Sequence, residues 1–131
     1  MSKQGFRSLC VVKRALYTEE VKKLLFVCTS NITRSPACED ILKGSSLYDT
    51  KSAGTSPNAA VVVTQELIDW ADMIFVMCER TDKHLTYLRK HFILGTKPVI
   101  DLDLPDFIYG QRNDPALIED LIKRMKPYLT I

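Results

Sequence analysis

The sequence has no long hydrophobic run. No apolar stretch approaches the roughly eighteen residues that a membrane-spanning helix needs. The only apolar run near the start, Leu9–Val12, is too short for the core of a signal peptide. We therefore expect a cytoplasmic protein that does not engage a membrane.

The charge pattern lacks the features of a nucleic-acid binder. The chain has 18 Lys and Arg against 16 Asp and Glu, so its formal net charge is only +2. No cluster of basic residues is interleaved with aromatic residues, as it is in many proteins that bind nucleic acid. The sequence predicts no nucleic-acid partner and leaves a local anion site open.

The cysteines lack the spacing of a zinc site or a disulfide framework. The four of them, Cys10, Cys28, Cys38 and Cys78, form no C-x-x-C pair and share no metal-ligand spacing with histidine. At 131 residues the chain has enough residues for one core without disulfide bonds. We expect reduced thiols, one domain, no metal and no cofactor.

Strand and helix patterns alternate along most of the chain. Buried strands are predicted at 23–28, 72–78 and 97–100, with a further short strand just before the turn-rich loop 54–58. Helices are predicted at 35–43, 61–70, 79–92 and from 115 onward. The fold class is therefore α/β, a doubly wound, four-stranded parallel sheet with helices on both faces. This domain spans 22–131, and residues 1–21 form an N-terminal extension that is either disordered or helical.

One stretch, "LLFVCTSNITRSP", places reactive groups where a buried strand ends. Cys28 closes the strand, and Arg34 stands at the start of the next helix. The N–H groups of such a tight loop, together with the helix N-terminus, form a cradle for an anion. Arg34 adds a planar fork that fits two phosphate oxygens, and the same positive surroundings favour the thiolate of Cys28. A thiolate below a bound oxyanion is a nucleophile aimed at phosphorus.

The segment "VCTSNITRSP" resembles the phosphate-binding signature of the low-molecular-weight protein tyrosine phosphatases. "SAGT" at 52–55 and "ADMIFVM" at 71–77 are similar to further landmarks of that family. The resemblance implies that Cys28 attacks phosphorus, Arg34 clamps the phosphoryl group, Ser35 steadies the thiolate and Asn31 holds the loop in shape. The implied phosphate-binding residues are Thr29, Ser30, Asn31, Ile32, Thr33, Arg34 and Ser35.

The chain departs from the family pattern within and after this loop. Ser30 stands where the family commonly has glycine, and Thr33 stands where a second cysteine is frequent, so Cys28 has no vicinal partner for a disulfide. The segment 56–70 between the two landmarks is shorter than in the family, which weakens the expectation of phosphotyrosine selectivity.

The loop "DLDLPDFIYG" supplies the candidates for a general acid, which the departure of a phenolate requires. The family's acid lies in a loop that reads Asp-Pro-Tyr-Tyr-Gly, and this resemblance selects Asp106, with Phe107 in place of proline. It also implies that Tyr109 flanks the substrate. Asp103 stays as an alternative acid, and Asp101 is expected to order the loop.

Together these features predict a phosphomonoester hydrolase, a protein-tyrosine or aryl phosphatase that works through a phosphocysteine. Its substrates would be phosphorylated proteins or small aryl phosphates. Two alternatives remain: an arsenate reductase of the same fold, for which Cys78 is present but Leu85 occupies the expected position of its partner, and a non-catalytic module that binds phospho-ligands. His84 and His91 are predicted to be surface or core residues.

Overall fold

The computed structural model describes residues 20–131. Residues 1–19, and with them nearly all of the predicted N-terminal extension, lie outside the described part. Within residues 20–131, four strands and five helices follow one another: β2 (Lys22–Cys28), α1 (Arg34–Leu42), β3 (Tyr48–Gly54), α2 (Gln65–Trp70), β4 (Met73–Val76), α3 (Glu79–Asp82), α4 (His84–His91), β5 (Val99–Asp101) and α5 (Pro115–Met125). No helix within 20–131 is long and apolar enough to cross a membrane.

The four strands form one parallel sheet in the order β3-β2-β4-β5. Cys28 at the end of β2 lies opposite Gly54 of β3, and Val27 lies opposite Val76 of β4. The predicted fold class, a doubly wound parallel sheet, is confirmed. In such a sheet the chain reverses its direction of growth between β2 and β4, and ligands bind outside the carboxyl ends of the strands at that point.

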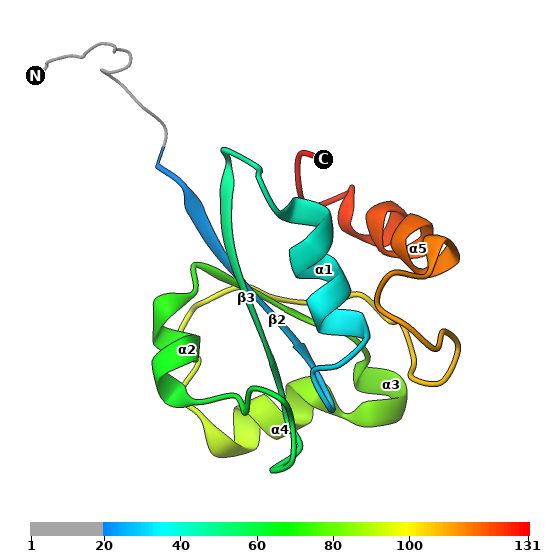
Figure 1. Ribbon diagram of the computed structural model, residues 1–131. Helices are drawn as coiled ribbons and strands as arrows, with labels where there is room; N and C mark the ends of the chain where they lie inside the picture. The colour runs from blue at the N-terminus through cyan, green and yellow to red at the C-terminus, as the bar shows by residue number, and fades with distance from the viewer. Residues whose placement is uncertain (1–19) are drawn as a thin grey trace, which may run out of the picture.

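Helices cover both faces of the sheet (Figure 1). Along β2 the side chains alternate, so that Leu24, Phe26 and Cys28 face the core under α1 and α5. Leu25 and Val27 face the opposite core, which α2 and α4 complete. Cys28 therefore ends its strand on the face that α1 covers.

The second helix is shorter than predicted. It begins at Gln65, where the Thr64 hydroxyl caps it by accepting a hydrogen bond from the N–H of Leu67 at 3.2 Å. The preceding residues run beside the end of β3 instead, because Gly54 exchanges backbone hydrogen bonds with Val61 and Val63. These bonds to β3 outweigh the helical pattern of 61–64.

The helix predicted for 79–92 is broken into α3 and α4. Lys83 between them adopts a left-handed conformation with φ of 57°, and the side chain of Glu79 accepts hydrogen bonds from the N–H and hydroxyl of Thr86. The break turns His84 into the interior, where it is fully buried. This residue lies close to the carboxyl end of the sheet, in contact with Thr29 and Cys78.

Candidate active site

The loop from β2 to α1 turns sharply at the carboxyl edge of the sheet. Cys28 is the last residue of β2, and Arg34 is the first residue of α1. Asn31 makes the turn with a left-handed backbone, φ 58°, a conformation that asparagine tolerates better than most residues. The motif therefore lies on a strand, loop and helix, as the sequence predicts.

The backbone of this loop is oriented by the segment that follows β3. The carbonyl of Thr29 accepts a hydrogen bond from the N–H of Ser56 at 3.0 Å, and the carbonyl of Ser30 accepts one from Ala60 at 3.1 Å. Within residues 20–131, the N–H groups of Ser30, Ile32 and Thr33 have no hydrogen-bond partner. Carbonyls bound outward and free N–H groups create a backbone site for an anion.

Gly54 makes this close contact possible. A Cβ atom at this position would lie 2.3 Å from the carbonyl oxygen of Thr29 and 2.7 Å from the Cβ of Ala59. Both distances are far below van der Waals contact, so a side chain here would push the two loops apart. The close approach of the two loops thus explains why position 54, within "SAGT", is occupied by glycine.

The sulfur of Cys28 receives polar contacts from its own loop. The N–H of Asn31 donates to Sγ at 3.2 Å, and the Ser35 hydroxyl lies 3.0 Å from the same atom. Cys28 is 2% exposed. These contacts hold the sulfur at the floor of the loop, where it can face a bound oxyanion.

Behind the loop, Asn31 is the centre of a buried polar chain. Its side-chain nitrogen donates to the hydroxyls of Ser35 at 2.9 Å and Ser52 at 2.8 Å, and its oxygen accepts from the N–H of Val61 at 3.1 Å. Ser52 in turn donates to the carboxylate of Glu39. This geometry supports the role implied for Asn31, which is to hold the loop in shape. Ser52 and Glu39 were not expected, because their relation to Asn31 exists only across β3 and α1.

The guanidinium of Arg34 is almost completely buried, at 4% exposure. Its Nη1 donates to the carbonyl of Leu104 at 2.9 Å and lies 2.8 Å from Oδ2 of Asp82. That buried carboxylate oxygen makes an ion pair without hydrogen-bond alignment. Nη2 donates to the hydroxyl of Thr29 at 3.4 Å. Nη1 is thus engaged, while Nε and the second N–H of Nη2 have no hydrogen-bond partner within residues 20–131 and can donate to two oxygens of a ligand.

A pocket of about 160 Å³ opens over this group of residues. Its lining consists of Cys28, Ser30, Ile32, Thr33, Arg34 and Asp106. Oδ2 of Asp106 lies 3.7 Å from Nη2 of Arg34. The structure therefore brings together the predicted nucleophile, the predicted clamp and the preferred candidate for the acid.

The two other loop carboxylates lie elsewhere. Asp103 is half exposed, does not line the pocket, and accepts a hydrogen bond from Nε of Arg80 at 3.1 Å. Asp101 accepts from the N–H groups of Glu79 and Asp103. Asp101 thus orders the loop as expected, and the position of Asp103 favours Asp106 as the acid.

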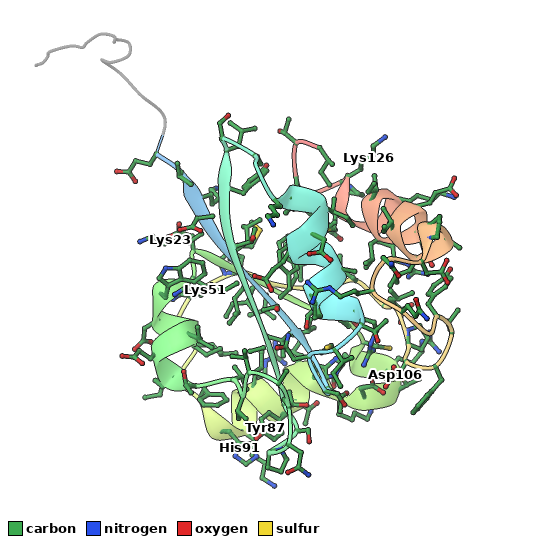
Figure 2. All side chains as sticks on the ribbon, viewed as in Figure 1. Lys23, Lys51, Tyr87, His91, Asp106 and Lys126 are labelled. Atoms are coloured by element: carbon green, nitrogen blue, oxygen red, sulfur yellow. The ribbon has the colours of Figure 1, made fainter. Side chains whose placement is uncertain are left out.

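The aromatic residues of this loop differ from the expectation. Tyr109 does not line the pocket; its hydroxyl donates to Asp120 of α5 at 3.0 Å, and this bond, followed by burial, raises the pKa of the phenol. The prediction that Tyr109 flanks the substrate thus has no support from this arrangement. Phe107 directly follows Asp106 in the chain, and its side chain is 96% exposed. Figure 2 labels Asp106 in this loop, near α3.

The remaining described cysteines do not reach the pocket. Cys78 lies after β4, where its sulfur receives a hydrogen bond from Thr81 at 3.1 Å. Cys38 is buried in the core, and burial, followed by the nearby Cys28, raises the pKa of its thiol. Leu85 packs on the opposite face of the sheet. Among the cysteines of residues 20–131, this arrangement offers no thiol pair of the kind that the arsenate reductase alternative requires.

Sequence reasoning missed His84 and Asp82. His84 is buried, with Nε2 2.9 Å from the hydroxyl of Thr29, while Nδ1 accepts a hydrogen bond from the N–H of Cys78 at 3.0 Å. Burial, followed by the charge of Arg34, lowers its pKa to about 4. Both residues reach the site because the helix is interrupted at Lys83. The helical periodicity of the sequence does not indicate this interruption.

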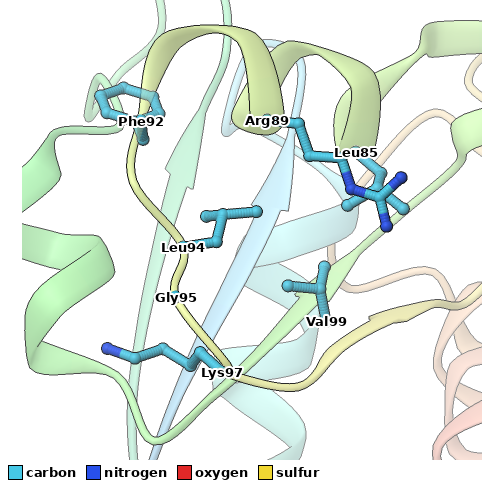
Figure 3. Close-up of a pocket in the computed structure, with 7 residues that line it drawn as sticks. All are labelled: Leu85, Arg89, Phe92, Leu94, Gly95, Lys97 and Val99. Atoms are coloured by element: carbon cyan, nitrogen blue, oxygen red, sulfur yellow. The ribbon is translucent and has the colours of Figure 1, made fainter.

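A separate pocket of about 320 Å³ lies between α4 and β5 (Figure 3). It is lined by Leu85, Arg89, Phe92, Leu94, Gly95, Lys97 and Val99. The ammonium of Lys97 donates to the backbone carbonyls of Ile68 and Asp69. None of the predicted site residues lines this pocket.

Comparisons with known proteins agree with this architecture. No protein-family model matches the chain, and no curated protein matches it. Among solved structures, the tyrosine phosphatase Wzb from Escherichia coli K30 in complex with phosphate superposes with a TM-score of 0.64 at 20% identity, over 83% of this chain and 96% of that chain. The low molecular weight protein tyrosine phosphatase SP-PTP from Streptococcus pyogenes has a TM-score of 0.62 at 20% identity, over 84% and 95%.

The YwlE arginine phosphatase from Geobacillus stearothermophilus is similar too, with a TM-score of 0.59 at 21% identity, over 81% of this chain and 94% of that chain. The described chain therefore has a doubly wound phosphatase fold. More narrowly, it is the fold of the low molecular weight protein tyrosine phosphatases.

Proposed function

We propose that the protein is a phosphomonoester hydrolase that works through a phosphocysteine on Cys28. The observation that carries this proposal is the single pocket in which Cys28, Arg34 and Asp106 meet. Each has the chemistry that one role of the reaction needs: a nucleophile, an oxyanion clamp and a proton donor.

In the first step the thiolate of Cys28 attacks phosphorus, and the bond from phosphorus to the leaving oxygen breaks. The loop N–H groups and the Nε/Nη2 edge of Arg34 bind the three non-bridging oxygens, where charge is held in the transition state. Asp106 gives its proton to the leaving oxygen. The products of this step are an alcohol or phenol and a phosphoryl group on sulfur.

In the second step water attacks the phosphocysteine, and inorganic phosphate leaves. Asp106, now a carboxylate, accepts a proton from the attacking water. The departing sulfur becomes a thiolate again, and the Ser35 hydroxyl at 3.0 Å and the Asn31 N–H at 3.2 Å stabilise it.

The rim of the pocket favours an aromatic leaving group. Ile32, which lines the pocket, is 63% exposed, and Phe107, which follows Asp106, is 96% exposed. Apolar side chains at a pocket mouth contribute when a ring packs against them. The substrates that fit best are phosphotyrosine in proteins and small aryl phosphates, and we expect the enzyme to meet them in the cytoplasm.

The test is hydrolysis of p-nitrophenyl phosphate by the wild-type protein and by Cys28→Ser. We expect turnover in the wild type, with or without a chelator, and none in Cys28→Ser. Cys38→Ala serves as the matched control and should keep its turnover, because Cys38 does not line the pocket. A Cys28→Ser protein that still works, or turnover that a chelator removes, contradicts the proposal.

The substrate class needs a second assay with phosphotyrosine and phosphoserine peptides of the same sequence. We expect the phosphotyrosine peptide to be the better substrate. An equal kcat/KM for both peptides contradicts the aryl preference without touching the mechanism on Cys28.

A further inference from the structure

His84 connects the segments that follow β2 and β4, the two strands between which the chain reverses its direction of growth. It follows the break after α3 and packs beneath the loop that leaves β2, with 0% of its surface exposed. One of its ring nitrogens contacts Cys78, two residues after the end of β4, and the other contacts Thr29, directly after β2. Ligands bind at this point in doubly wound folds.

The contacts of His84 define its tautomer. Nδ1 accepts a hydrogen bond from the backbone N–H of Cys78 at 3.0 Å, so Nδ1 carries no proton. A neutral imidazole that accepts at one nitrogen has its proton on the other. Nε2 therefore donates its N–H to the hydroxyl of Thr29 at 2.9 Å. Oδ2 of Asp82 lies farther from Nε2, at 3.6 Å.

The hydroxyl of Thr29 passes this constraint on to Arg34. It accepts a hydrogen bond from Nη2 of Arg34 at 3.4 Å, whereas the Leu104 carbonyl and Asp82 engage Nη1. The guanidinium plane is thereby supported at both terminal nitrogens. A rotation of this plane would misdirect the Nε/Nη2 edge.

We propose that His84 is a positioning residue of the active site, which as a neutral imidazole fixes Thr29 and, through it, the phosphate-binding edge of Arg34. The idea rests on the proposed phosphatase function, since Arg34 matters only if it binds a phosphoryl group. His84 itself does not line the pocket.

The surroundings keep His84 neutral during turnover. The charged groups that face it are Arg34 on α1, Asp82 on α3, Asp101 on β5 and Asp106 in the following loop. Burial has the largest effect, followed by the positive Arg34, and both outweigh the three carboxylates, so the pKa of the imidazole is lowered to about 4. His84 thus keeps its donor and acceptor pattern at every pH at which the enzyme is expected to work.

The two ring nitrogens can be tested separately. The amide nitrogen of His84→Gln takes the place of Nε2 and can still donate to Thr29, but the N–H of Cys78 loses its acceptor. The amide oxygen of His84→Asn takes the place of Nδ1 and can still accept from Cys78, but nothing reaches Thr29. His91→Gln is the matched control, because His91 is exposed and packs on Tyr87, with ring centroids 4.2 Å apart, away from Asp106 (Figure 2).

We expect His84→Asn to lower kcat with p-nitrophenyl phosphate by about tenfold, the effect of one lost hydrogen bond. His84→Gln should stay within roughly threefold of the wild type. Thr29→Val should match His84→Asn, and the double variant should be no worse than either single one, because both remove the same link. A more active His84→Asn than His84→Gln, or additive losses in the double variant, overturns the proposal and leaves His84 a support for Cys78 alone.

Two measurements separate this proposal from the proposed function, since neither needs turnover. Long-range proton–nitrogen NMR of the wild type should show His84 protonated at Nε2 only, and a proton on Nδ1 overturns the idea. Titration with inorganic phosphate, followed at the Arg34 Nε–H resonance, should give weaker binding in His84→Asn than in His84→Gln. Equal phosphate affinities contradict the role of His84, whereas an inactive wild type contradicts the phosphatase function.

Discussion

The two loops that make the pocket are built in opposite ways. In the nucleophile loop, 28–35, the side chains of Cys28, Asn31, Arg34 and Ser35 are buried. Hydrogen bonds connect this loop to β3, to the segment 54–61 and to α4. The acid loop, 102–113, contains two left-handed residues, Asp103 and Phe107, and its tip is largely exposed. Asp106 is connected to the nucleophile loop only through the 3.7 Å approach to Arg34.

The difference corresponds to what each loop has to do. Stabilising an oxyanion requires donors that are already in place before the reaction, and buried hydrogen bonds keep them there. A proton donor must serve first the leaving group and then the incoming water, and an exposed loop leaves room for both. The nucleophile loop should therefore be sensitive to small structural changes, and the acid loop chiefly to loss of its carboxyl.

The largest expected effect is at the acid loop's one reactive group. Asp106→Asn should lower kcat by roughly 10²–10⁴-fold for aryl phosphates with poor leaving groups, and less for good ones, because the help of the acid grows with the charge on the leaving oxygen. The measurement is kcat across a series of substituted phenyl phosphates. Asp103→Asn is the matched control, and a larger loss there would transfer the role to Asp103.

The next effect concerns the fork of Arg34. Arg34→Ala should lower kcat/KM by roughly 10²–10³-fold, as the loss of a preorganised oxyanion donor does. Arg34→Lys should recover little, because an ammonium cannot place two parallel N–H groups on a phosphate. Steady-state kinetics of both variants checks this. If Arg34→Lys comes within tenfold of the wild type, charge alone is sufficient and the geometry of the fork is irrelevant.

Acidification should destabilise the fold around the nucleophile loop. The folded-state pKa of His84 is about 4, below the ordinary 6.5, so between these values the unfolded chain binds the proton and the folded chain does not. The contribution of His84 to the free energy of unfolding is therefore fully present above about pH 6.5. Roughly 3 kcal/mol of it is lost as the pH falls toward 4. Urea unfolding at pH 7 and pH 4 measures the loss. His84→Gln should abolish this contribution and His91→Gln should keep it; an identical loss in all three proteins refutes the assignment.

Substituting one glycine at each loop compares the two loops directly. Gly54→Ala brings a Cβ to 2.3 Å from the Thr29 carbonyl and should cost about 1–3 kcal/mol of stability, together with weaker phosphate binding. Gly110→Ala in the acid loop meets nothing within 4 Å and should change stability by less than about 0.5 kcal/mol. Thermal unfolding and phosphate titration of the two variants measure these changes in stability and in phosphate affinity. Equal costs at both sites would remove the contrast between the loops.

The smallest effect is expected at Phe107. Because its side chain is 96% exposed, Phe107→Ala should leave the free energy of unfolding unchanged within about 0.5 kcal/mol. It should raise KM for aryl phosphates a few-fold, roughly what one lost aromatic contact is worth, and leave KM for alkyl phosphates unchanged. A similar change for both substrate classes would mean that Phe107 does not contact the leaving group.

The contrast also explains what could be predicted from the sequence. The strand, loop and helix around Cys28 and Arg34 lie within one residue of their predicted bounds, because a buried strand, a short loop and a helix start are all local patterns. The sheet and its two helical layers followed from the alternation of strands and helices. Asp106 was selected by a loop motif, and its presence in the pocket agrees with that choice.

What could not be predicted depends on contacts between distant segments. His84 was assigned to the surface or core because the helical pattern of 79–92 hides the break at Lys83. Tyr109 was expected at the pocket, but its hydroxyl finds Asp120 on α5, a partner that no local motif reveals. Ser52 and Glu39 likewise become part of the site only when β3 and α1 pack together.

The central claim is that Cys28 carries the phosphoryl group during turnover. Rapid acid quenching of the Asp106→Ala protein with p-nitrophenyl phosphate, followed by peptide mass spectrometry, tests it directly, because loss of the base slows hydrolysis of the intermediate while this good leaving group still departs. We predict a phosphorylated peptide whose modification lies on Cys28 and which disappears in the Cys28→Ser/Asp106→Ala double variant. Steady turnover with no phosphoryl group on Cys28 at any quench time, or with the group on another residue, would contradict the account.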